Sequence, residues 1–156
     1  MDTRELHEQA YALCKPAIDL LLEQYAKRKH YHIVVMDPRK KPWESSFRDA
    51  VLAEFSEGKD EWAHDYRKIA RSKAEQAWRN QQANIITQML APATLRSGDT
   101  FYYGSFEYHG VIVACSGVEP YFDMLISGWI ALAYQQLAQH YVETHKKAYP
   151  NEDYMP

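Results

Sequence analysis

The hydrophobic pattern changes its period most clearly across Ser116 and Gly117. Before this point, residues 101–106 and 110–115 are rich in β-branched and aromatic side chains, which predicts two strands joined by a tight turn. After it, apolar positions recur at helical spacing and predict a long helix from about residue 121 to 146. The segment therefore places a loop and a helix start at one end of a sheet. Such a place can bind a ligand, or it can be only a junction of the fold.

A helix is also predicted at the beginning of the chain, where apolar side chains recur every three or four residues. Asp2 or Thr3 is its expected N-cap. We expect a kink or a restart at Pro16, because proline lacks the amide donor and its ring disfavours helical geometry in the preceding residue. The β-branched segment 31–36 then predicts a buried strand, and residues 43–47 are interpreted as its hairpin partner.

The central part of the chain predicts short helices with breaks between them. We expect a short helical piece over residues 50–55, a helix capped by Asp60, and one or two helical turns over residues 83–90 that end before Pro92. The elements thus run helix, two strands, helices, two or three strands, helix. This order argues for an α+β fold built around an antiparallel sheet.

Length and composition predict one ordinary globular domain. The chain has 156 residues, enough for one hydrophobic core, and we assign residues 1–148 to a single domain. The polar segment 149–156 contains Pro150 and is predicted to be a mobile tail. Twelve Tyr and four Trp are many for this length, and such side chains favour protein interfaces and pockets for flat ligands as well as the core.

Charge and hydropathy argue against several classes of partner. The net charge is −3 and the longest basic block is residues 39–41, so a nucleic-acid groove is not expected. The longest apolar run, residues 124–134, is interrupted and is shorter than the about 20 residues that span a bilayer. Cys14 and Cys115 lie far apart in apolar surroundings and are interpreted as buried free thiols. The first nine residues lack the features of a secretory signal, and a cytoplasmic location is expected.

Histidines are the first candidates for site chemistry. His30 and His32 would share one face of a strand, and paired histidines can bind a metal, but no third ligand lies in register with them. We therefore expect no metal site. His109, beside Gly110 at the end of a predicted hairpin, could line a pocket rim or ligate a cofactor iron, or it could simply be a polar turn residue.

Ser116, Asp123 and a pair of cations supply the other candidates. A serine nucleophile elbow, G-x-S-x-G, would need glycine where Ala114 and Val118 stand, so the sequence does not support one at Ser116. No glycine-rich phosphate loop occurs in the sequence either. Asp123 stands in the first turn of the last helix, where a carboxylate can act in catalysis or simply favour the helix N-terminus. Arg71 and Lys73 lie on a predicted basic helix face, which could anchor a carboxylate or propionate group or remain solvated.

Three blocks of sequence, taken in order, resemble the GlcG/HbpS-like family of small domains, which includes haem-binding members. The first block is Ile33-Val34-Val35-Met36-Asp37 after the opening helix. The second is the helical segment 69–77, IARSKAEQA. The third is GVIVACSG at residues 110–117, with Asp123 downstream. Where the family usually has Gly-Gly-x-Pro before the penultimate strand, this chain has Tyr102-Tyr103-Gly104-Ser105.

The resemblance implies a profilin-like antiparallel sheet of about five strands flanked by helices, and assembly into dimers or larger rings. It also implies, for some members, haem or another flat ligand. The cofactor is not identified by these residues, although haem fits the pattern. Expected ligand contacts are Arg71, Lys73, Tyr103, His109, Ser116, Gly117 and Asp123.

The leading interpretation is a non-enzymatic protein that binds a small planar or carboxylated molecule, with haem as one candidate, and that assembles with copies of itself. Tyr102, Tyr108 and His109 would supply aromatic and axial contacts beside the cationic anchor. One alternative is an interaction or scaffold protein that uses its aromatic surface and the tail. Another is an enzyme acting on a small oxo-acid, with Asp123 and His109 as an acid/base pair.

Overall fold

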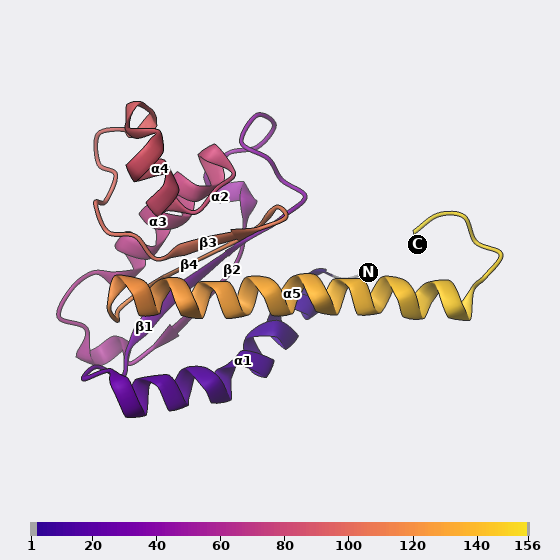
Figure 1. Ribbon diagram of the computed structural model, residues 1–156, viewed down its shortest axis with the longest axis horizontal. Coiled ribbons are helices and arrows are strands. Elements are labelled where there is room, and N and C mark those ends of the chain that lie inside the picture. The colour runs from indigo at the N-terminus through magenta and orange to yellow at the C-terminus, as the bar shows by residue number, and fades with distance from the viewer. Residues whose placement is uncertain (1–2, 156) are drawn as a thin grey trace.

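Four antiparallel strands form one sheet in the part of the chain that the structure describes (Figure 1). The computed structural model describes residues 3–155, and side chains from residue 5 onward. The strand order is β2–β1–β4–β3, and every neighbouring pair is antiparallel. The strands are β1 (Tyr31–Met36), β2 (Val51–Glu57), β3 (Ser105–Tyr108) and β4 (Val111–Ser116). The predicted α+β class with an antiparallel sheet is confirmed, with four described strands where the resemblance implies about five.

Helices lie on both faces of this sheet. The two long helices pack together on one face, and a third helix covers β1 and β4 on the other. The long helices are α1 (Thr3–Tyr25) and α5 (Pro120–Ala148), and the opposite helix is α3 (Tyr66–Asn80). The shorter helices are α2 (Phe47–Ala50) and α4 (Asn84–Leu90), with single 3₁₀ turns at Lys59–Glu61 and Pro92–Thr94. No helix within residues 3–155 is long and apolar enough to cross a membrane.

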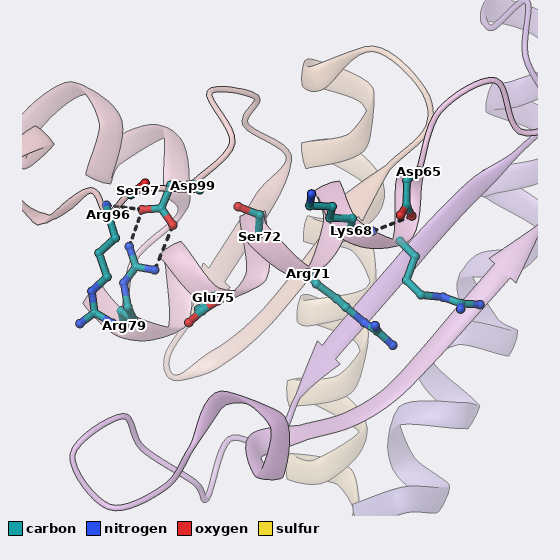
Figure 2. Close-up of a pocket in the computed structure, with 11 residues that line it drawn as sticks. Asp65, Lys68, Arg71, Ser72, Glu75, Arg79, Arg96, Ser97 and Asp99 are labelled. Atoms are coloured by element: carbon teal, nitrogen blue, oxygen red, sulfur yellow. Dashed lines mark hydrogen bonds and ion pairs between the residues drawn. The ribbon is translucent and has the colours of Figure 1, made fainter.

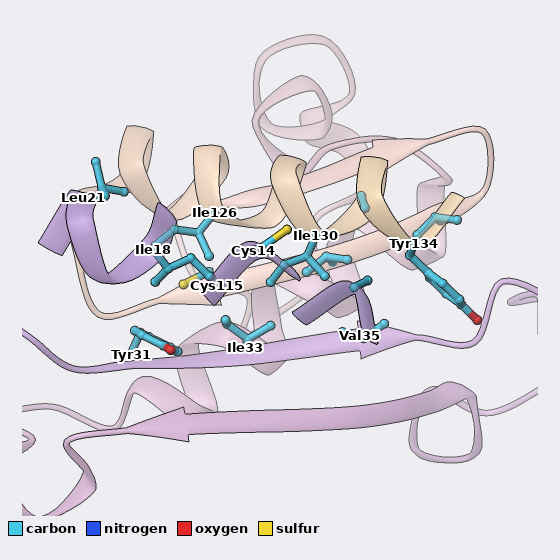
Figure 3. Close-up of a cluster of buried hydrophobic side chains, with 14 of the residues drawn as sticks. Cys14, Ile18, Leu21, Tyr31, Ile33, Val35, Cys115, Ile126, Ile130 and Tyr134 are labelled. Carbon is cyan, nitrogen blue, oxygen red and sulfur yellow. The ribbon is translucent and has the colours of Figure 1, made fainter. Parts of the chain in front are cut away.

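Side chains of β1 enter two separate hydrophobic clusters, because successive residues of a strand point to opposite faces. Ile33 and Val35 face α1 and α5, where they meet Ile18 and Ile130 (Figure 3). Val34 faces α3 and belongs to the second cluster. Burial on both faces explains why every residue of β1 except His32 is hydrophobic, and why the sequence alone located this strand correctly.

The packing surface of α3 is made of small side chains. Ala70, Ala74 and Ala77 are all fully buried against the sheet, and Trp78 closes one end of this row. Alanines allow the helix backbone to approach the strands closely. The close approach brings longer residues of α3, including Lys73, within reach of the far end of β4.

The second strand of the sheet corrects two predictions. Residues 43–47, predicted to be a strand, form a turn up to residue 46 and then the first residue of α2. The first turn of α2 is capped by the Ser46 hydroxyl, which accepts from the Asp49 amide at 3.2 Å. The strand that pairs with β1 is β2 instead, and it includes most of the segment 50–55, which was predicted to be helical. A β-bulge interrupts its pairing with β1 between Val35 and Met36. Because of the bulge, Leu52 and Phe55 pack on the same core although they are three residues apart, which resembles helical spacing.

Helix boundaries also differ in places from the predictions. The helix predicted to start after Asp60 begins at Tyr66, and its cap is Asp65, which accepts from the Lys68 amide at 3.0 Å. α1 continues through Pro16 as a single helix, and Figure 1 shows it changing direction about midway. The predicted N-caps, Asp2 and Thr3, have side chains that lie outside those the structure describes. Cys14 and Cys115 are buried free thiols, as predicted.

Candidate functional site

A pocket of about 230 Å³ opens where β4 ends and α5 begins. It brings together four of the predicted ligand contacts, which come from α3, the end of β4 and the first turn of α5. They are Lys73, Ser116, Gly117 and Asp123. The other lining residues are Arg28, His64, Tyr66, Ile69, Tyr102, Val118, Glu119 and Pro120.

At the base of the pocket, Lys73 and Asp123 form an ion pair that is almost fully removed from water. Lys73 Nζ donates to Asp123 Oδ2 at 3.1 Å, and their side chains are 1% and 2% exposed. Lys73 Nζ also donates to the backbone carbonyl of Cys115 at 2.9 Å. The pair therefore ties α3 to α5 across the end of β4.

Asp123 is held in a specific orientation by the loop between β4 and α5. Its Oδ1 accepts a hydrogen bond of 3.0 Å from the Val118 backbone amide. Burial raises the pKa of Asp123 above its ordinary value, while the charge of Lys73 acts in the opposite direction. Burial also raises the pKa of the neighbouring Cys115 thiol, so this sulfur stays protonated. The pocket therefore has a carboxylate that gains a proton more readily than an exposed aspartate.

Gly104 lies directly against the ion pair. A Cβ at this position would come within 2.8 Å of both Lys73 Nζ and the Asp123 Cβ. The glycine is fixed by Asn84, whose Oδ1 accepts from the Gly104 amide at 3.2 Å, and by the Ser127 hydroxyl, which donates to the Gly104 carbonyl at 2.7 Å. The absence of a side chain at residue 104 thus leaves room for the ammonium group of Lys73.

Aromatic side chains and one arginine form the outer part of the pocket. Tyr66 is buried in α3, and Tyr102 is 60% exposed at the rim. Asn84 Nδ2 donates to the Tyr102 carbonyl at 3.0 Å and so fixes the backbone of this rim. Arg28 Nη1 donates to the Tyr66 hydroxyl at 3.1 Å, and its other terminal nitrogen lies 3.8 Å from Glu119. The sequence did not single out Arg28, Tyr66 or Asn84, because their roles depend on contacts that are distant along the chain.

The remaining predicted contacts lie elsewhere. Arg71 makes two hydrogen bonds to Glu54, at 2.7 and 2.8 Å, and does not line this pocket. His109 lies in the β3–β4 turn at the opposite end of β4, about 17 Å along the strand from the Ser116 end. Its ring packs on Tyr108. The oxo-acid enzyme hypothesis requires His109 and Asp123 to lie close together, and the structure places them apart. Tyr103 does not line the pocket either, although it adjoins Tyr102.

A second, more open pocket of about 500 Å³ lies along α3 and the loop before β3 (Figure 2). Arg71 belongs to it, with Lys68, Glu75 and other charged side chains. Arg79 and Asp99 form an ion pair there at 2.6 Å. Five basic and three acidic side chains line this surface, and Arg71 is already engaged with Glu54.

His30 and His32 point to the same face, as predicted from their alternate spacing. The His30 ring stacks on Tyr66 with centroids 5.2 Å apart, and the His32 ring contacts Trp62 edge-on at 5.9 Å. His32 is hydrogen-bonded to side chains of β2. Within the residues that the structure describes, no three potential ligands among His, Cys, Asp and Glu gather as a metal site.

Comparisons with known proteins bear on the fold alone. No protein-family model matches the chain, and no curated protein matches its sequence. Among solved structures, the chain is similar to the one titled "Crystal structure of Ybr137w protein", with a TM-score of 0.54 and 16% identity over 85% of this chain and 84% of that chain. The likeness covers most of both chains, so the α+β arrangement seen here also occurs in a protein of known structure.

Proposed function

We propose that the protein binds a small planar or carboxylated molecule without catalysing a reaction, and that it works as an oligomer of its own chain. The binding site is the pocket between α3 and the start of α5. Its base carries the charged groups Lys73 and Asp123, and its wall and rim carry Tyr66 and Tyr102. Pockets of this kind, with a few polar groups inside an aromatic wall, are typical of small-molecule sites.

The single observation that carries this proposal is the incomplete hydrogen bonding of Lys73. An ammonium group has three N–H donors, and two of them bond to Cys115 and Asp123. The third has no partner among the described residues, although the side chain is 1% exposed and lines the pocket. An unpaired donor of a buried charge is costly. A carboxylate or carbonyl oxygen of a ligand would satisfy it.

The size of the pocket favours a ligand smaller than haem. At about 230 Å³ it lies below the roughly 300–1,000 Å³ typical of sites for drug-sized ligands. A single aromatic or conjugated ring with one carboxylate suits the volume and the tyrosines. Haem would need additional surface, which an assembled oligomer could supply, and its proposed axial ligand His109 lies at the other end of β4.

The outer surfaces of the two long helices support the proposed self-association. Leu13 and Leu20 on α1 are 66% and 53% exposed, and Leu125 and Leu132 on α5 are 38% and 40% exposed. Exposed leucines at seven-residue spacing lie on one side of each helix. This arrangement fits membership of the GlcG/HbpS-like family with a profilin-like fold, which we also propose. Free thiols at Cys14 and Cys115 fit a reducing compartment, and the cytoplasm is the proposed location.

The binding proposal is tested with benzoate, a planar carboxylate, by isothermal titration calorimetry on the full chain. Saturable binding is expected. Tyr102→Ala is expected to weaken it about two- to tenfold, since loss of an aromatic contact costs about 0.5–1.5 kcal/mol. Tyr103→Ala is the matched control, because Tyr103 does not line the pocket. Absence of binding by benzoate and by related ring carboxylates, or equal effects of the two substitutions, would contradict the proposal.

The haem version has its own test. Purified protein is titrated with haemin, and the Soret band is followed in the wild type and in His109→Ala. A shifted band that disappears in the variant supports axial ligation by His109. No shift, or the same shift in the variant, excludes that mode of haem binding.

Self-association is tested by light scattering after size exclusion. The wild type is expected to run as a dimer or larger assembly, and the double variant Leu13→Glu/Leu20→Glu as a smaller species. Glu23→Lys on the same helix is the control for a change of charge alone. A monomeric wild type would rule out the oligomer.

A further inference from the structure

His32 is hydrogen-bonded through both of its ring nitrogens. Its Nδ1 lies 2.6 Å from the Ser56 hydroxyl oxygen, and its Nε2 lies 2.8 Å from Glu54 Oε1. The strand register explains this geometry: His32 pairs directly with Ser56, and Glu54 is two residues away on the same face of β2. A serine, a histidine and a carboxylate are thus aligned across two adjacent strands.

The protonation of the group follows from its neighbours. Glu54 also accepts two hydrogen bonds from Arg71, which together with His32 lower its pKa to about 2 although burial opposes this. An ionised carboxylate only accepts hydrogen bonds, so Nε2 of His32 carries a proton. Burial lowers the pKa of His32, which favours the neutral ring. Its Nδ1 therefore has a free lone pair that accepts the Ser56 hydroxyl proton.

Ser56 is exposed, whereas His32 is buried and Glu54 is partly buried. The Ser56 residue is exposed on β2, an edge strand, while the His32 side chain is 2% exposed and Glu54 is 25% exposed. Trp62 packs edge-on against the histidine ring. The hydroxyl can thus meet a molecule from solution, whereas the base is held in one orientation by its surroundings.

A positive charge accompanies the group. Arg67 and Arg71, one turn apart on α3, both act electrostatically on His32. Arg71 is engaged with Glu54, and Figure 2 shows it reaching from α3 over the neighbouring strands. Arg67 makes no ion pair or hydrogen bond through its side chain within residues 3–155, and it can stabilise negative charge that develops on a nearby oxygen.

We propose that Ser56, His32 and Glu54 form a second site, separate from the ligand pocket, in which Ser56 accepts the acyl group of a small carboxylic ester. Ser56 Oγ attacks the carbonyl carbon while His32 Nδ1 takes the hydroxyl proton, and Glu54 stabilises the imidazolium. The ester C–O bond breaks, and His32 returns the proton to the departing alcohol. The products are an acyl ester on Ser56 and a free alcohol. Relative to chymotrypsin-type triads, the two ring nitrogens exchange their roles.

This site is tested by labelling the whole 156-residue chain. It is treated with p-nitrophenyl acetate and, separately, with a fluorophosphonate probe. Release of p-nitrophenol is followed by absorbance, and modified peptides are located by mass spectrometry. Ser97, an exposed serine that has no histidine partner within residues 3–155, is the internal reference. Because a positioned base contributes about 10²–10⁴-fold, we expect Ser56 to react at least about a hundredfold faster than Ser97.

Variants separate a nucleophile from a structural hydrogen bond. Ser56→Ala is expected to abolish the rapid labelling, and Ser97→Ala to leave it unchanged. His32→Gln is expected to slow the labelling of Ser56 to the rate of Ser97, with the fold checked by circular dichroism. Glu54→Gln gives the same test if His32→Gln does not fold. The proposal is overturned if Ser56 reacts no faster than Ser97, or if rapid labelling persists in Ser56→Ala. Neither result depends on benzoate binding, so this proposal and the proposed function fail separately.

Discussion

Lys73 and Asp123 meet through a 3.1 Å hydrogen bond although fifty residues separate them along the chain. The pair closes the base of the pocket and joins α3 to α5, on opposite faces of the sheet. Breaking such a pair leaves a single charge in the interior, which is far more costly than losing a surface ion pair. The pair therefore links the stability of the fold to the chemistry of the pocket.

The first prediction concerns this pair. Lys73→Met is expected to lower the free energy of unfolding by about 3–5 kcal/mol, because Asp123 is left buried without its partner. The double variant Lys73→Met/Asp123→Leu is expected to recover much of that loss. Lys146→Met, which removes a pair between exposed side chains, should change stability by no more than about 1 kcal/mol. Urea denaturation measures all three variants, and equal effects of Lys73→Met and Lys146→Met would contradict the assignment.

The second prediction concerns the space beside the ion pair. Gly104→Ala is expected to destabilise the fold, because its Cβ would lie 2.7 Å from the Cys115 carbonyl oxygen. Gly98→Ala is the control, since Gly98 also has a positive φ, of 92°, but a Cβ there would have no neighbour within 4 Å. Backbone strain alone costs about 1–2 kcal/mol. Denaturation should show Gly104→Ala to be the more costly by about 1–3 kcal/mol, the usual cost of overpacking. A smaller loss than that of Gly98→Ala would show that the pocket base adjusts freely.

The third prediction concerns acid stability. The pKa of Glu54 is about 2 in the folded protein, against an ordinary value of 4.5. The unfolded chain therefore binds more protons at this residue, and its contribution to stability is lost as the pH falls from about 4.5 towards 2. Denaturation followed over this range should show a shallower pH dependence in Glu54→Gln than in the wild type. Glu23→Gln, an exposed carboxylate on α1, should keep the wild-type slope.

The fourth prediction joins pH to ligand binding and rests on the proposed function. Burial raises the pKa of Asp123, and a carboxylate ligand brought beside it would favour its protonated form further. The affinity for benzoate should therefore rise as the pH falls towards the pKa of Asp123. Calorimetry in two buffers with different ionisation enthalpies should detect proton uptake on binding. Asp123→Asn should bind benzoate with no such uptake, and uptake that persists in this variant would assign the proton to another group.

The elements with the simplest patterns could be located from the order of residues alone. β1 and β4 are buried on both faces, so their residues are apolar for most of their length and both strands were predicted correctly. The helical spacing after Gly117 likewise located α5. A regular pattern of buried positions appears in the sequence as a hydrophobic period. This period can be recognised without knowing which element packs against which.

Where the chemical groups meet depends on the tertiary structure. Arg71 and Lys73 are two residues apart and were predicted to form a shared anchor, yet they point to different sides of α3 and bind Glu54 and Asp123 respectively. The bulge in β2 breaks the alternating pattern expected of a strand, so the sequence predicted neither β2 nor the contact between His32 and Ser56. Periodicity reports that a side chain is buried, whereas its partner depends on strand register and on how closely helices approach the sheet. For this reason the sequence located the junction at Ser116 and Gly117, and the fold supplied the lysine that makes it a candidate binding site.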